Sequence, residues 1–251
     1  MNIKKYKAFS LIELSVVILI IGLLSAGVLQ GASVIQKARI ANARTLTSKS
    51  PVTHIGGLVA WYETTLIKSF NQSEAHQDSQ LTAWNDVNPR SQVTNSNILT
   101  RTADSKVTYE ADGINKLPSV YFSTTTGNFT LPSFQQGPLE RSTIFTVFSG
   151  HSTHFYNNMS FVYSYDGNSG ITIGSDRMYW LLDNGSSYHY WKTLDGYENY
   201  IMVTYLNDQA SKAYLNEAVT SSPAQTSSAG TDPLDGLAVG LKVAHCCGFK
   251  G

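Results

Sequence analysis

The chain has 251 residues, which is enough for one membrane-anchoring helix and one sizeable globular domain. Its 18 basic residues balance its 18 acidic ones, so no excess of positive charge indicates a nucleic-acid partner. The two cysteines, Cys246 and Cys247, are adjacent, so they cannot close a long loop, and no Cys/His spacing indicates a metal site.

The first thirty residues combine a basic lead with a long apolar run. Lys4, Lys5 and Lys7 precede residues 9–29, in which Glu13 is the only charged residue. About 20 apolar residues in a helix suffice to cross a bilayer. A carboxylate in such a segment costs about 2.5–3.5 kcal/mol on insertion scales, so its presence indicates a function.

The segment Lys7-Ala8-Phe9-Ser10-Leu11-Ile12-Glu13 resembles the cleavage and methylation segment of type IV pilins and pseudopilins. The resemblance implies that prepilin peptidase cuts between Ala8 and Phe9 and methylates the new amino group of Phe9. It also implies that Glu13 pairs with the Phe9 amino group of a neighbouring subunit during assembly. That family usually has glycine where Ala8 stands in this chain.

Two other interpretations of this segment remain open. An ordinary secretory signal would be cut near Gly27, or Glu13 would be solvated by lipid headgroups at the start of a simple anchor. Glu13 favours the pilin-like interpretation, because the core of an ordinary signal gains nothing from a carboxylate. Removal of residues 1–8 would leave 15 basic residues against 18 acidic ones, which again argues against binding to polyanions.

The apolar run continues into an amphipathic one, and together they predict one helix over residues 9–46. Apolar residues at three- and four-residue steps predict the stripe that contacts a globular head: Val34, Ile35, Ala38 and Leu46. The polar residues between them, among them Gln36 and Arg44, are expected to face elsewhere. Pro51 and the glycines that follow it then end the helix and begin a linker.

After residue 57, short runs rich in Val, Ile, Thr and aromatic residues alternate with turn residues. The expected strands are 58–62, 107–110, 119–123, 143–148, 160–165, 171–174, 178–182, 188–192, 200–206, 212–215 and 237–243. This spacing predicts an α+β chain, in which a long N-terminal transmembrane helix is followed by an all-β jelly-roll sandwich. We expect a leader at 1–8, a transmembrane and assembly helix at 9–46, a linker at 47–57 and a head at 58–251.

Several of these segments resemble concanavalin A-like, laminin-G-type sandwich domains. The similar segments are 57–62 (GLVAWY), 83–86 (AWND), 117–122 (LPSVYF), 143–148 (TIFTVF), 203–205 (VTY) and 213–216 (AYLN). Where that family usually has Asn-Gly after the last of these segments, this chain has Asn216-Glu217. The resemblance implies a lectin-like head.

No set of residues indicates catalysis, so we expect that the chain is not an enzyme. His151 and His154 lie close to Ser149 and Ser152, but no GxSxG elbow accompanies them. No cofactor is expected either, although calcium could be bound by the oxygen ligands of Asp166-Gly167-Asn168 and Asp183-Asn184. Neither segment has the ligand ladder of an EF-hand, and hairpin turns explain the same residues without an ion.

Aromatic residues are concentrated between residues 179 and 200. Strand alternation places Tyr188 and Tyr190 on one face, with His189 and Trp191 on the other. One set would fill the sandwich, which leaves the other as a platform for a sugar ring or a protein partner. Tyr188, Tyr190 and Trp191 are therefore the candidate ligand-binding residues, and core packing alone is the alternative.

The sequence favours a minor pilin or a pseudopilin of a secretion machine. Such a subunit would sit in the inner membrane with its head in the periplasm, and would then join a pilus or pseudopilus. The expected partners are prepilin peptidase and other pilin subunits, with a glycan or surface protein as a further partner of the head. The alternative is a membrane-anchored or secreted glycan-binding or glycan-active protein with no role in a fibre.

Overall fold

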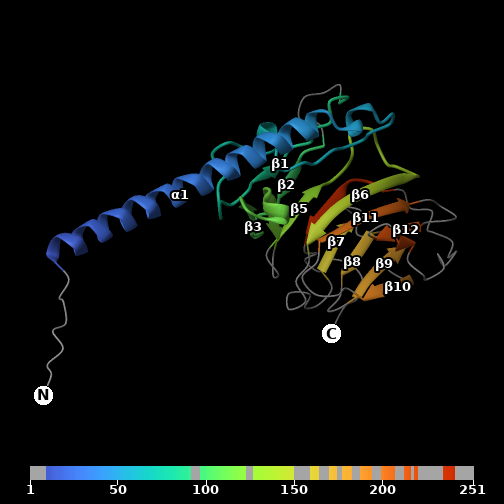
Figure 1. Cartoon of the computed structure of the whole chain (residues 1–251). Helices are drawn as coiled ribbons and strands as arrows, with labels where there is room; N and C mark the ends of the chain where they lie inside the picture. The colour runs from blue at the N-terminus through green and yellow to red at the C-terminus, as the bar shows by residue number, and fades with distance from the viewer. Residues whose placement is uncertain are drawn as a thin grey trace, which may run out of the picture.

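The chain forms one long helix that leads into a β-rich head (Figure 1). The computed structural model describes residues 10–91, 97–122, 127–149, 159–163, 170–173, 177–182, 187–193, 199–206, 212–215, 218–219 and 234–240. This order of elements confirms the predicted α+β class, with one apolar helix followed by β-sheets.

Helix α1 spans Leu11–Ser48, and its 38 residues correspond to about 57 Å of helix. Its first half projects away from the head, and its second half lies along the head (Figure 1). The helix ends at Ser48, slightly beyond the predicted end at residue 46, and Pro51, which cannot continue it, opens a short 3-10 helix, η1 (Pro51–His54). Two further 3-10 turns follow in the head, η2 (Ile67–Ser69) and η3 (Ile114–Lys116).

The described strands form three sheets, and all of their pairings are antiparallel. The largest has the order β1 (Ala83–Trp84), β2 (Leu99–Arg101), β5 (Asn128–Leu131), β14 (Leu237–Gly240), β7 (Met159–Tyr163), β8 (Gly170–Ile173), β9 (Arg177–Leu182), β10 (Ser187–Thr193). The second has the order β13 (Ala218–Val219), β12 (Lys212–Leu215), β11 (Asn199–Leu206), β6 (Ser142–Ser149). The third is the hairpin of β3 (Val107–Glu110) and β4 (Ser119–Phe122).

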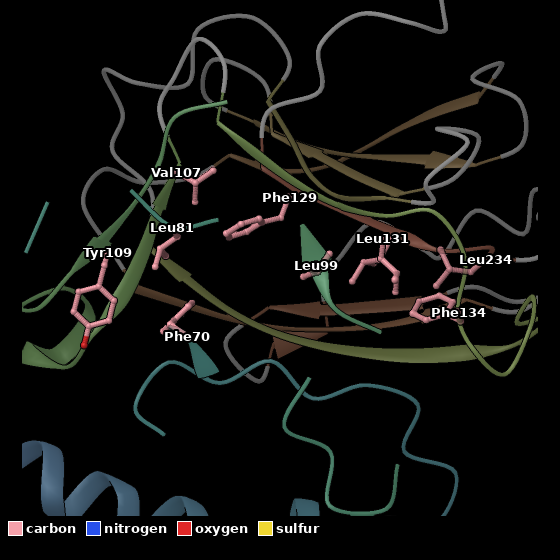
Figure 2. Packing of buried hydrophobic residues seen from close by; sticks show 10 residues of the cluster. Phe70, Leu81, Leu99, Val107, Tyr109, Phe129, Leu131, Phe134 and Leu234 are labelled. Carbon is pink, nitrogen blue, oxygen red and sulfur yellow. The ribbon is translucent and has the colours of Figure 1, made fainter. Parts of the chain in front are cut away.

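One hydrophobic core joins the hairpin to the largest sheet (Figure 2). Its members are Phe70, Leu81, Leu99, Val107, Tyr109, Phe129, Leu131, Phe134, Leu234 and Leu237. Trp84 packs against this cluster, with its ring 5.9 Å from that of Phe70 and 6.3 Å from that of Phe129. Ile144 of β6 also packs against the cluster, so the second sheet contributes to the same core.

The second sheet has a buried face and an exposed face, as strand alternation requires. Tyr200 and Met202 of β11 are buried, and the Tyr200 ring stacks on Phe148 of β6 at 5.2 Å. On the other face Phe145 and Val147 are exposed, and Ile201, the cross-strand partner of Val147, is exposed beside them.

Most of the predicted strands are present, but the prediction for residues 58–62 is wrong. Side chains take the place of a neighbouring strand there. Asp86 accepts a hydrogen bond from the Trp61 N–H, while Asn88 and Asn97 donate to the carbonyl groups of Leu58 and Val59. The short strands β1, β2, β5 and β13 are present but were not predicted.

Candidate functional site

The N-terminal end of α1 carries the residues that the sequence singles out for processing and assembly. Ala8 and Phe9 lie outside the described residues, which begin at Ser10. Ser10 has an extended backbone, and its Oγ accepts the Ile12 N–H at 3.3 Å. Glu13 Oε2 accepts the Ser10 N–H at 2.9 Å, which completes a capping box. The Ser-x-x-Glu spacing that produces this cap was present in the sequence and was overlooked.

The first half of α1 is apolar and exposed. The side chains from Leu11 to Val28 are all exposed, and they include Ile18, Leu19, Leu23 and Leu24. The helix is long and apolar enough to cross a membrane, and none of its most apolar part is buried within the chain. Exposed apolar surface of this extent needs a bilayer or other apolar helices to cover it.

The second half of α1 lies on the head with a different face from the one predicted. Gln36 Nε2 donates to the carbonyl groups of Ala111 and Lys116, at 2.9 and 3.1 Å, and Arg44 Nε donates to the carbonyl of Thr65 at 2.7 Å. The half-buried positions are Gln36, Ile40, Ala43, Arg44 and Thr47.

The predicted apolar stripe therefore faces outward. Val34 is 64% exposed, Ile35 55% and Leu46 64%. Hydrogen bonds from long polar side chains to head carbonyls decide which face docks, and hydrophobic periodicity does not report on such bonds.

Arg90 ties the segment after the helix to the head. Its Nε donates to the carbonyl of Thr53 at 3.2 Å, and its Nη2 donates to that of His54 at 3.3 Å. With Gln36 and Arg44, it makes the third polar side chain that holds the stem and linker against the head.

Asp86 lies in a partly buried polar cluster next to the linker. Its Oδ1 accepts from the N–H groups of Trp61 and Asn88, at 2.8 and 2.9 Å. Burial raises the pKa of Asp86, although these two hydrogen bonds oppose the shift. Burial and the Asp86 charge both raise the pKa of Tyr62, whose hydroxyl donates to the Asn97 carbonyl.

A shallow hollow of about 700 Å³ lies where α1 meets the head, and its lining includes Arg44, Lys68 and the apolar Ile67. Both cations of the hollow are engaged, because Arg44 donates to the Thr65 carbonyl at 2.7 Å and Lys68 Nζ donates to the Val87 carbonyl at 3.1 Å. Lys68 also lies close enough to Asp86 for its charge to oppose the rise in the pKa of that carboxyl.

The candidate platform residues lie on β10, at the edge of the largest sheet. Tyr188 pairs with Leu181 of β9, and Tyr190 pairs with Tyr179. The register shifts between Tyr190 and Lys192, so Trp191 falls at an irregularity of the strand. The platform role of Tyr188, Tyr190 and Trp191 remains a prediction.

The other predicted chemical sites fall largely outside the described residues. His151, His154, both calcium candidates and the two cysteines all lie there. Over the ranges that the structure does describe, no group of three or more His, Cys, Asp or Glu side chains could hold a metal ion. The calcium prediction is untested.

Comparison with known proteins identifies the N-terminal segment. Residues 3–29 match the family described as the prokaryotic N-terminal methylation motif, and no curated protein matches the chain. This match covers the basic lead, the expected cleavage point and the start of α1, so it supports prepilin peptidase processing and assembly with other pilins.

Solved structures similar to the chain include sialidases of Trypanosoma rangeli. One, in complex with 2-keto-3-deoxy-D-glycero-D-galacto-2,3-difluoro-nononic acid, is 11% identical with a TM-score of 0.47, and the match covers 69% of this chain and 27% of that one. Another, in complex with sialic acid, is 11% identical with a TM-score of 0.47, and the match covers 84% of this chain and 34% of that one. This chain therefore spans only about a third or less of the sialidase chains.

The prediction that the chain is not an enzyme is contradicted by this comparison, because the similar solved structures are those of enzymes. At this identity and TM-score the likeness assigns no activity to the chain. What the comparisons and the fold show together is a type IV pilin-like N-terminal segment, followed by a head built of β-sheets.

Proposed function

We propose that the chain is a type IV pilin-like subunit, either a minor pilin or a pseudopilin. Prepilin peptidase cuts it before Phe9 and methylates the new amino group. The first half of α1 holds the subunit in the inner membrane and later packs among the helices of other pilin subunits. The head, periplasmic before assembly, is displayed for adhesion or for binding a partner.

One observation carries this proposal: the methylation motif coincides with the start of a long helix whose apolar half is uncovered. Residues 3–29 hold the motif, and α1 from Leu11 to Val28 makes no buried contact with the head. A signal that was cut off near Gly27 would discard this surface, whereas a retained stem would use it for anchoring and then for assembly.

The proposed assembly role of Glu13 has a physical basis in its surroundings. Its neighbours along the helix are apolar, so its charge is costly at membrane depth unless a positive group or hydrogen-bond donors satisfy it. The amino group that cleavage creates at Phe9 of an adjacent subunit supplies such a positive charge.

Two surfaces of the head support a role in binding. The exposed face of β6 and β11 presents Phe145 and Val147, and the hollow beside α1 presents Arg44 and Lys68. Exposed apolar surface, and a hollow lined partly by cationic side chains, favour contact with other molecules.

The test is the mass of the mature N-terminus, measured on protein from whole cells and from fibres sheared from their surface. We expect a chain that begins with methylated Phe9 and is present in the fibre fraction or in an isolated secretion complex. A chain that keeps Met1, or one that starts near Gly27, would contradict the proposal and would leave a plain anchored or secreted head.

The matched control is Glu13→Ala. We expect this variant to enter the membrane and to be absent from the fibre fraction, because the assembly partner of Phe9 has been removed together with the acceptor of the Ser10 N–H. Incorporation at the wild-type level would show that Glu13 has no part in assembly.

A further inference from the structure

The stem helix starts at a point that two side chains define. Ser10 has ψ of 144°, outside the helical range, and its carbonyl accepts the first backbone bond of the helix from the Leu14 N–H at 3.1 Å. The Ser10 Oγ and Glu13 Oε2 bonds fix this geometry from both sides. Leu11 is therefore the first helical residue because of the capping box.

The sequence before this point lacks the two residues that most strongly interrupt a helix. Residues 1–9 have neither glycine nor proline, and Ala8 has the highest helix propensity of all residues. In the absence of a cap, a helix that is already nucleated can add residues at its N-terminal end at little cost. The capping box opposes that extension, because the N-cap residue must keep a non-helical backbone.

Helical structure across the cleavage point would hinder a peptidase. A helix that extended over residues 8 and 9 would commit the carbonyl group of Ala8, at the bond to be cut, to a hydrogen bond from the Ile12 N–H. Enzymes and receptors that bind a peptide main chain usually take it in an extended form, with those groups free to pair.

We propose that the Ser10–Glu13 capping box positions the Ala8–Phe9 bond for prepilin peptidase, by starting the helix at Leu11 and keeping it off that bond. This inference rests on the proposed cleavage before Phe9. Ser10 acts as a positioning residue, and it takes no part in the chemistry of cleavage. Glu13 thereby has a partner within its own subunit before assembly begins.

The test measures the initial rate at which prepilin peptidase cuts the full-length chain in membranes, with the products identified by mass. Ser10→Ala removes the hydroxyl acceptor, and we expect cleavage to slow by about fivefold, the factor that loss of one N-cap makes in an equilibrium constant. Ser10→Thr keeps the hydroxyl and should be cut at close to the wild-type rate.

The decisive variant is Ala8→Gly in the Ser10→Ala background. Glycine disfavours helix, so it should restore the rate without restoring the cap. Ala8→Gly alone is the control, because glycine is also the residue that the resembled family usually has before the cut, and it should be cut at close to the wild-type rate. The backbone carbon chemical shifts of residues 8 and 9, measured in detergent micelles, should become helical in Ser10→Ala and should return in the double variant. A direct contact between the Ser10 hydroxyl and the peptidase would not be rescued in this way.

Glu13→Gln separates the cap from the charge. Its amide oxygen can still accept the Ser10 N–H, so cleavage should continue at close to the wild-type rate while incorporation into fibres is lost. Wild-type cleavage of Ser10→Ala, or slow cleavage that Ala8→Gly does not rescue, would overturn the capping inference. A wild-type chain that is not cut before Phe9 would instead overturn the proposed function itself.

Discussion

Asp86 and two asparagines near it illustrate how side chains can take the place of a neighbouring strand. The segment 58–62 has the composition of a strand, yet its polar backbone groups are bonded by Asp86, Asn88 and Asn97. A strand prediction from composition assumes a neighbouring strand as partner, and here the partners are side chains more than 20 residues away. No local sequence pattern predicts that side chains will replace a neighbouring strand in this way.

The raised pKa of Asp86 makes the stability of the head depend on pH. Because burial raises its pKa in the folded state, the folded chain binds the proton more tightly than the unfolded chain does. The resulting stabilisation is complete below the ordinary pKa of an aspartate and is lost as the pH rises through the raised value. Protonation of Asp86 in mild acid should therefore raise the melting temperature, and Asp86→Asn should remove this contribution.

The measurement is the difference in melting temperature between wild type and Asp86→Asn across the acidic range. Taking the difference cancels Glu74, whose pKa is lowered, because hydrogen bonds from Thr82 and Asn71 outweigh its partial burial. Asp112→Asn is the matched control, since Asp112 has only an exposed salt bridge with Lys116. If both variants shift the curve equally, Asp86 is not the source of the pH dependence.

At the scale of elements, the existence and length of α1 were predicted well, whereas the face of α1 that docks on the head was predicted wrongly. A run of apolar residues without proline is sufficient to predict the helix and its length. The docking face depends on which head carbonyls lie within reach of Gln36 and Arg44, and those carbonyls belong to residues 21–80 positions away. The sequence therefore predicts that a stem exists, but it does not predict how the stem is attached.

The attachment can be tested with two arginines on the same helix. Arg44→Ala removes the bond to the Thr65 carbonyl, and it should destabilise the docking of the stem by about 1–2 kcal/mol. Amide hydrogen exchange at Thr65 and Leu66 should become faster, because the turn that contains them would lose its anchor to the helix.

Arg39→Ala serves as the control for that change. Arg39 lies on the exposed side of α1, so its removal should leave the exchange of Thr65 and Leu66 unchanged. Equal effects of the two variants would mean that charge on the helix matters, and that the Arg44 bond does not.

At the scale of the whole molecule, the sequence predicts the positions of many strands, but it does not predict which strands pair with each other. The predicted strands 107–110 and 212–215 appear at the expected residues, as β3 and β12. Sheet order depends on pairings that span most of the head, such as β5 with β14 and β1 with β2, and antiparallel alternation alone does not determine them. The exposed apolar face of β6 and β11 was missed for the same reason.

Gly236 makes the pairing of β5 with β14 possible. Its φ is +71°, and a β-carbon at this position would collide with the carbonyl oxygen of Leu131. Gly236→Ala should therefore destabilise the head by about 3 kcal/mol or more, as judged by denaturant unfolding in detergent.

Gly137 isolates the collision from the backbone strain. Its φ is +84°, but open space surrounds it, so Gly137→Ala should cost only about 1 kcal/mol. Similar losses for the two glycines would show that backbone strain alone explains Gly236.

The position of β14 has a consequence for the order in which the protein is made. This strand lies between β5 and β7, so it joins the half of the largest sheet that is synthesised early to the half that is synthesised late. Until residues 237–240 have left the ribosome, the two halves lack their shared strand and cannot close as one sheet. The stem, by contrast, is complete after about fifty residues. We therefore expect the helix to reach the membrane long before the head can fold, with the unfinished strand edges kept apart during that interval.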